Sequence, residues 1–233
     1  MENQTFGAWM STFAWSSGST SSSGSASSSG STSSSDAAGA AAAGAAVALS
    51  GSGGGEGSGS GDLVIAWDAY DGRWFQTAAS AIPLMTFERN GHCMTADYSA
   101  IPDAPTPTLR VVNGMSVGSP TGPREVAVGE ATLNEGSTNS LTVTFQEPVP
   151  MPPASYVVGA VGPVRGKQYQ WAIVTNDTRT VSFVLARNPD TFEVEYGEDV
   201  QAALEGLGLT KELNKPRPTT HGTEACLQAY AEL

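Results

Sequence analysis

The sequence predicts an all-β fold: an eight-stranded antiparallel up-and-down barrel with one C-terminal α-helix packed outside it, preceded by a disordered N-terminal segment. Three observations support this prediction. From residue 62 onward, short apolar runs with a period of two are separated by clusters of Gly, Pro and Asn, which is typical of antiparallel β-structure. Residues 11–61, before this point, are almost entirely Ser, Gly and Ala. One later segment has the apolar spacing of a helix.

The N-terminal part differs from the rest in composition. Residues 11–61 consist mostly of Ser, Gly and Ala, and the only charged residues among them are Asp36 and Glu56. Such a segment has too little bulky apolar surface to offset the entropy lost when its backbone is ordered. We therefore expect a low-complexity tail or linker over residues 1–61 and a folded barrel domain over residues 62–233.

The first fifteen residues, MENQTFGAWMSTFAW, place Trp9, Phe13 and Trp15 close to helical spacing. A segment with this pattern can contact a membrane surface or a protein, and the alternative is an incidental stub before the linker. The Ala-rich stretch at residues 37–50 lacks a basic flank, so it gives no clear targeting signal.

Eight runs in the folded part have the length and alternation of strands. The short links between them, such as GPVRGK and NDTR, favour an up-and-down barrel over a Greek-key sandwich, which needs longer crossings. The predicted strands are Arg73–Ala79, His92–Ser99, Thr106–Asn113, Arg124–Leu133, Ser140–Gln146, Tyr156–Val161, Gln168–Thr175 and Thr180–Arg187.

A helix is expected after the last strand. Between Asp190 and Leu207, the residues Phe192, Val200, Leu204 and Leu207 suit a helical stripe over the second half of the segment, and the glycines at positions 206 and 208 end it.

Alternation within the strands indicates which residues share a face. In LTVTFQ the apolar residues Leu141, Val143 and Phe145 alternate with threonines, and in GKQYQWAIV the residues Tyr169, Trp171 and Ile173 alternate with glutamines. We expect one bulky apolar face and one partly polar face. An eight-stranded barrel with the apolar face inward has room for its own side chains or for one small ligand.

Charge and motifs exclude several functions. The net charge of −12 argues against a nucleic-acid partner, which requires a basic face. The two histidines, His92 and His221, are too few for a metal site, and no spaced cluster of Cys and His is present in the sequence. No phosphate-binding loop or nucleophile elbow is found either. We expect no metal and no cofactor, and the oligomeric state stays open.

Three stretches, in order along the chain, resemble the lipocalin family: YDGRW at the first strand, YQWAIVTND across a late strand and turn, and FVLARNP at the last strand. Two stretches, FERNGHCMTADYS and FVLARNP, are most similar to those of the group of apolipoprotein D and the bacterial lipocalins. The resemblance implies a lipocalin-type barrel. It also implies that Gly72 allows a close approach at the closed end, that Trp74 plugs this end, and that Arg187 lies over the indole ring.

The resemblance also bears on the two cysteines, because lipocalins of the apolipoprotein D group have a bridge that implies a Cys93–Cys226 disulfide here. It would tie the C-terminal segment to the outside of the barrel. Two free buried thiols are the alternative. The bridge fits a secreted or extracellular protein or another oxidising compartment, with the plastid lumen as the alternative. In a secreted chain, Asn176 of Asn176-Asp177-Thr178 is a glycosylation candidate.

Alternation and resemblance together suggest binding, transport or sequestration of a small hydrophobic molecule such as a lipid, fatty acid, sterol, retinoid-like compound or pigment. The candidate ligand-binding residues are Tyr98, Phe145, Trp171 and Phe183, and plain core packing is the alternative for each. Two other functions stay open. One is a structural or assembly subunit with a filled barrel. The other is a lipid-modifying or pigment-modifying enzyme, such as an isomerase or de-epoxidase, although the predicted inward faces lack an obvious acid, base or nucleophile apart from His92.

Overall fold

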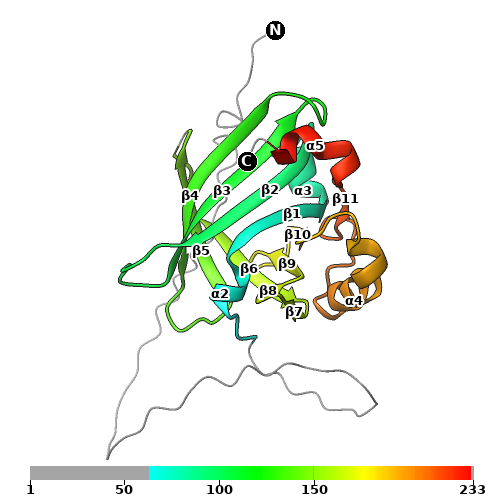
Figure 1. Ribbon diagram of the computed structural model, residues 1–233. Coiled ribbons are helices and arrows are strands. Elements are labelled where there is room, and N and C mark those ends of the chain that lie inside the picture. The colour runs from blue at the N-terminus through cyan, green and yellow to red at the C-terminus, as the bar shows by residue number, and fades with distance from the viewer. Residues whose placement is uncertain (1–62, 149, 232–233) are drawn as a thin grey trace, which may run out of the picture. The chain divides into compact units, whose positions relative to one another are not determined.

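The computed structural model describes residues 63–148 and 150–231. The predicted tail at residues 1–61 and its candidate membrane or protein contact lie outside these residues. Within them, eight antiparallel strands form a closed sheet, because β10 pairs with β1 as well as with β9. The predicted fold class is confirmed (Figure 1). The barrel strands are β1 (Gly72–Ala79), β2 (Gly91–Ala100), β3 (Thr108–Val117), β4 (Arg124–Leu133), β5 (Ser140–Glu147), β6 (Ala154–Val161), β9 (Trp171–Thr175) and β10 (Ser182–Ala186).

The predicted strand Gln168–Thr175 is interrupted at Gln170. The structure divides it into β8 (Gln168–Tyr169), which forms a hairpin with β7 (Val164–Arg165), and the barrel strand β9. The backbone N–H of Gln170 donates to the carbonyl of Pro163 instead of to a neighbouring barrel strand. This local bond ends the hairpin and changes the alternation between Tyr169 and Trp171.

Helix α4 (Phe192–Gly206) packs on the outside of the barrel (Figure 1). It buries Phe192, Tyr196, Val200 and Leu204, which recur every four residues and so lie on one face of the helix. Their cluster includes side chains from β9 and β10. The outer surface of these two strands is therefore apolar and covered, unlike an outer surface exposed to water.

The chain after α4 contains more structure than the one helix predicted. Strand β11 (Arg217–Pro218) pairs with β1, and helix α5 (Thr223–Ala231), kinked at Cys226, lies against β2. The predicted disulfide is present between Cys93 and Cys226, with the Cα atoms 5.6 Å apart. A bulge in β2 gives Cys93 a φ of 54°, and its N–H donates to Thr220 of the C-terminal segment. The bulge thus directs the side chain of Cys93 towards α5.

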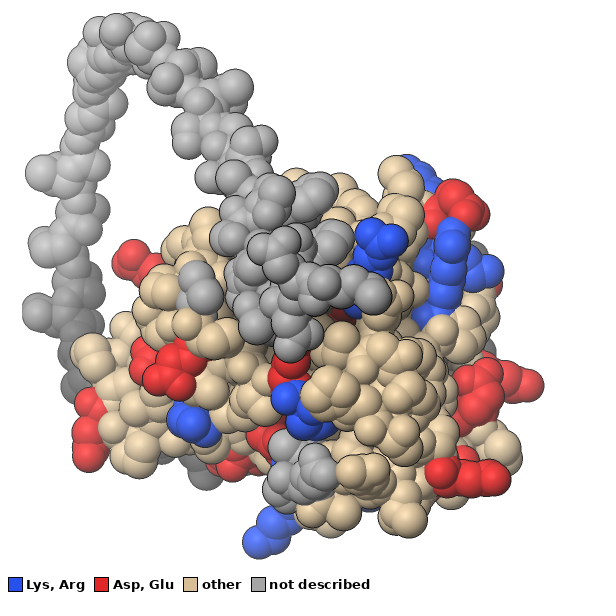
Figure 2. Space-filling model, turned by 90° about the horizontal axis from the view of Figure 1, so that it is seen from above, with Lys and Arg blue, Asp and Glu red and all other residues tan. Residues whose placement is uncertain are grey.

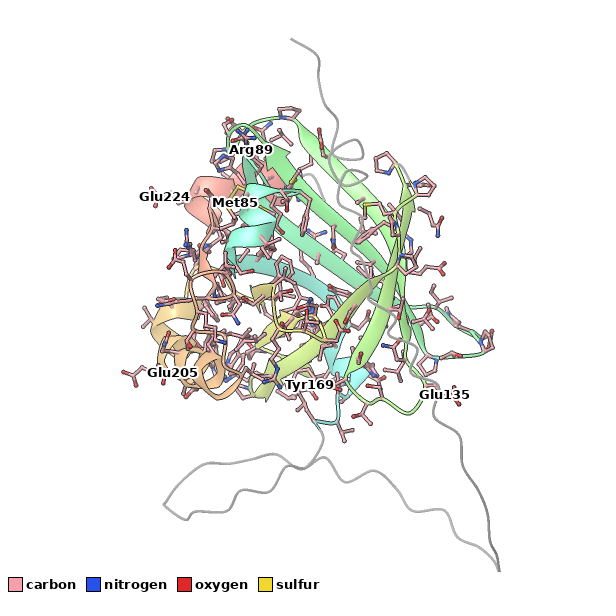
Figure 3. All side chains as sticks on the ribbon, turned by 180° about the vertical axis from the view of Figure 1, so that it is seen from behind. Met85, Arg89, Glu135, Tyr169, Glu205 and Glu224 are labelled. Carbon is pink, nitrogen blue, oxygen red and sulfur yellow. A yellow bond between two sulfur atoms is a disulfide. The ribbon has the colours of Figure 1, made fainter. Side chains whose placement is uncertain are left out.

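Two short helices lie at opposite ends of the barrel. Helix α2 (Trp67–Tyr70) precedes β1 at the closed end, and helix α3 (Ala81–Met85) begins the connection from β1 to β2 at the other end. Figure 3 shows Met85 and Arg89 of this connection at the end opposite Tyr169 and Glu135. Among the described residues, no helix is long and apolar enough to cross a membrane.

The closed end is built around Trp74, which is completely buried. The guanidinium carbon of Arg187 lies 3.7 Å from the centre of the Trp74 ring, and its nitrogens donate to five carbonyls, including those of Arg73 (2.6 Å) and Asp71 (2.7 Å). Gly72 has a φ of +93°, and a Cβ there would lie 2.9 Å from Gln168 Nε2. Arg187 therefore holds the chain between α2 and β1 by hydrogen bonds across the base of the barrel.

Acidic and basic side chains are interspersed on the surface seen in Figure 2.

Candidate functional site

The barrel contains a partly open cavity of about 240 Å³. Its walls are mainly apolar because alternate residues of each strand point inward. On β3 and β5, for example, Val111, Met115, Val143 and Phe145 face it. The apolar side chains that line the cavity from the strands are Met94, Ala96, Val111, Met115, Val143, Phe145, Ala154, Val174, Phe183 and Leu185.

Tyrosines form the floor of this cavity. Tyr98 and Tyr156 line it, and Tyr98 pairs with Gly72 at the start of β1, which places it near the closed end. The oxygen of Tyr156 lies 2.8 Å from that of Tyr98 and 2.6 Å from that of Tyr70. The ring of Tyr70 is 5.0 Å from that of Trp74. The floor therefore combines buried aromatic surface with a chain of three hydroxyls.

The three tyrosines remain protonated near neutral pH. Burial raises the pKa of Tyr70, Tyr98 and Tyr156 well above the usual value of a phenol. Hydrogen bonds from Tyr156 act in the opposite direction on the other two, but desolvation is the larger effect. The floor consequently presents hydroxyl groups and no phenolate.

A carboxyl group lies towards the end of the cavity opposite the tyrosine floor. Glu88 follows α3 in the connection between β1 and β2, and it is 8% exposed. Gln76 Nε2 donates to Glu88 Oε2 at 2.9 Å, and both residues line the cavity. Burial raises the pKa of Glu88 to about 7, and the hydrogen bond from Gln76 offsets part of that effect. Glu88 therefore stays protonated to a higher pH than an ordinary glutamate.

Asn113 adds a polar group to the wall of the cavity. Its Oδ1 is buried, and it has no hydrogen-bond partner among the described residues. A water molecule or a donor group on a ligand could satisfy it.

The structure brings three of the four candidate ligand residues together. Tyr98, Phe145 and Phe183 line the cavity. The expectation that Trp171 faces inward is wrong, because Trp171 packs with Phe192 and Tyr196 beneath α4. On β9 the smaller residues Ala172 and Val174 face the barrel interior. Alternation alone misassigned this strand because α4 makes its outer face as apolar as its inner face.

Glu88, Tyr156 and Tyr70 were not predicted as site residues. Tyr156 could have been found, since it shares the parity of the buried Val158 on a predicted strand. Glu88 and Tyr70 lie outside the strands, where no alternation indicates a direction. The expectation that the interior lacks an acidic group is therefore corrected by a residue of the β1–β2 connection.

The glycosylation candidate Asn176 lies at the end of β9 and is 2% exposed. Its Nδ2 donates to the hydroxyls of Thr178 (2.8 Å) and Thr180 (3.0 Å), and its Oδ1 accepts from the backbone N–H of Thr180. The folded chain uses this amide to fix the β9–β10 turn and does not present it to solvent, and glycosylation of Asn176 stays a prediction.

The comparisons with known proteins agree with this architecture. The family model described as lipocalin-like domain matches residues 65–217. None of the curated proteins matches the chain.

Solved structures with a similar fold include apocrustacyanins and an insect protein. Apocrustacyanin C1 and apocrustacyanin C2 are each 15% identical to this chain, with 72% of this chain and 86% of the other covered and a TM-score of 0.51. Insecticyanin from the tobacco hornworm Manduca sexta is 17% identical, with 71% and 85% covered and a TM-score of 0.50. At these identities the likeness concerns the fold.

Proposed function

The chain belongs to the family of the lipocalin-like domain, and on that premise we propose that it binds a small hydrophobic molecule in the barrel cavity, for transport or for sequestration. We further propose that it is nearest to the group of apolipoprotein D and the bacterial lipocalins. The stretches FERNGHCMTADYS and FVLARNP and the Cys93–Cys226 disulfide support this placement. The disulfide also supports an oxidising compartment.

The observation that carries the binding function is the apolar cavity within the closed barrel. A ligand that enters it removes its apolar surface from water, which contributes about 25 cal/mol per Å². Because the walls are strands of one closed sheet, the cavity is largely formed before the ligand arrives, and little ordering opposes binding.

The cavity also separates this proposal from its alternatives. A structural subunit with a filled barrel needs no internal volume, whereas about 240 Å³ is present here. An enzyme needs an acid, base or nucleophile at the reacting centre. Among the described residues that line the cavity, Glu88 carries the one carboxyl group, and it is hydrogen-bonded to Gln76. The apolar walls favour binding without chemistry.

Titration of the full chain with the fluorescent apolar probe phenylnaphthylamine tests the proposal. The probe should bind with a stoichiometry of one, and Phe183→Ala should weaken binding because the ring lines the cavity. The control is Phe75→Ala, whose ring packs outside the barrel at 4.5 Å from that of Tyr230. Equal effects of the two substitutions, or no probe binding at all, would contradict the proposal.

A further inference from the structure

The chain of hydroxyls at the cavity floor has one proton more than it uses internally. Tyr156 is the middle member, within hydrogen-bonding distance of both Tyr70 and Tyr98. Each hydroxyl carries one proton, and each hydrogen bond uses one. Three hydroxyls joined by two bonds leave one O–H group, for which the described residues provide no further acceptor.

Burial decides which tyrosine holds the unused proton. Tyr70 is completely buried and does not line the cavity, whereas Tyr98 and Tyr156 do. If the unused proton were on Tyr70, an unpaired donor would be enclosed in the core, which is unfavourable. When Tyr70 donates to Tyr156, the unused proton lies instead on Tyr156 or on Tyr98. The spare donor therefore belongs to a residue that lines the cavity.

The surroundings favour a neutral acceptor for this donor. Among the described residues that line the cavity, none is Lys, Arg or His, and Glu88 lines it as well. The nearby cation, Arg187, is bonded to backbone carbonyls at the base of the barrel and does not line the cavity. A carboxylate on the floor would lose its hydration without gaining a cationic partner, and one hydroxyl proton does not compensate for that loss.

We propose that the cavity selects an apolar molecule whose leading end carries a neutral carbonyl oxygen, which accepts the unused hydroxyl proton of Tyr156 or Tyr98. This inference rests on the proposed function, since it concerns the same cavity. The volume of about 240 Å³ lies just below the range of roughly 300–1,000 Å³ usual for ligand pockets. The ligand that fits it is therefore compact.

The test uses the full chain and three probes with matched carbon chains: methyl octyl ketone, decane and decanoic acid. Each displaces phenylnaphthylamine from the wild type and from variants of the floor at pH 8. Tyr98→Phe and Tyr156→Phe each leave one cavity hydroxyl, so they serve as matched controls for the double variant, which leaves none. Because loss of the Tyr156 hydroxyl strands that of Tyr70 in both the single Tyr156→Phe variant and the double variant, a triple variant that adds Tyr70→Phe removes all three hydroxyls without a buried orphan.

The ketone should bind more tightly than decane and decanoic acid in the wild type and in both single variants. In the double and triple variants the advantage of the ketone over decane should fall by about five- to tenfold, while decane affinity stays the same. An undiminished ketone advantage in the triple variant would overturn the hydroxyl assignment. Tighter binding of decanoate than of the ketone would overturn the choice of a neutral head group. If decane and phenylnaphthylamine bind but the ketone has no advantage, the inference alone fails. If neither binds, the proposed function fails too.

Discussion

Replacement of Glu88 by glutamine should stabilise the barrel, and the gain should grow with pH. Glu88 is buried beside Gln76, and its pKa rises from an ordinary 4.5 to about 7 on folding. Below pH 4.5 the carboxyl is protonated in both the folded and the unfolded chain, so it contributes no difference. As the pH rises from 4.5 towards 7, the unfolded chain ionises first, and the folded state loses relative stability.

The size of this effect follows from the two pKa values. Each pH unit between them costs the folded state about 1.4 kcal/mol, so the loss reaches about 3 kcal/mol above pH 7. Glutamine does not ionise, and its side-chain oxygen can still accept the hydrogen bond from Gln76. The variant should therefore match the wild type near pH 4, apart from a constant offset, and exceed its free energy of unfolding by about 3 kcal/mol at pH 8.

Urea denaturation at several pH values, followed by near-UV circular dichroism, measures the difference. Glu135→Gln is the control for loss of one negative charge, because Glu135 is exposed in the β4–β5 loop at the opposite end of the barrel (Figure 3). A difference between Glu88→Gln and wild type that stays constant from pH 4 to pH 8 would refute the reasoning. It would mean that water reaches the carboxyl in the folded protein.

Three further predictions concern the framework of the barrel. Arg187→Ala should lower the free energy of unfolding by about 3 kcal/mol, since carbonyls of Arg73, Tyr70 and Asp71 lose a charged donor and Trp74 loses its stacked guanidinium, while phenylnaphthylamine affinity stays within about twofold of wild type. Unchanged stability with lost binding would reverse this assignment. The double variant Cys93→Ser/Cys226→Ser should have a free energy of unfolding about 2–5 kcal/mol lower in urea denaturation, because the bridge closes a loop with a sequence separation of 133. A wild type whose free energy of unfolding is the same with and without a reductant would contradict this prediction. Deletion of residues 11–61 should leave the melting temperature within about 2 °C of that of the full chain, because the residues that form the core clusters, among the described ones, begin at Leu63. A loss of cooperative unfolding would show that the domain boundary is misplaced.

The alternation of apolar and polar residues along the chain was sufficient to predict the strands of the barrel. On β5, Leu141, Val143 and Phe145 face inward while the threonines between them do not, so a period of two gave both the strand and its orientation. The same reasoning failed on β9, where Trp171 and Ile173 are covered by α4 and both faces are apolar. Periodicity shows that a strand has two different faces, but the element that covers each face is a tertiary property.

The C-terminal segment shows another limit of sequence reasoning. Helix α5 has nine residues and a non-helical φ/ψ at Cys226, and a helix this short has little stability alone in water. Its cluster of Cys93, Cys226 and Ala229, with Tyr230 packed against it, holds it on β2. The helix therefore depends on a covalent and tertiary partner that lies far away in the sequence, and no local pattern indicates it.

The polar groups of the cavity follow the same logic, and they explain why the site was only partly predictable. Tyr98 is on a strand and lies at the same parity as Ala96 and Met94, which indicated an inward side chain. Its partners come from β6 and from the segment before β1, and the count of hydroxyl protons has meaning only after Tyr70, Tyr156 and Tyr98 are placed together. Apolar walls are a property of individual strands, whereas a spare donor is a property of the assembled floor. Selectivity among hydrophobic ligands should therefore change with substitutions that leave the alternation pattern intact, as Tyr→Phe substitutions do.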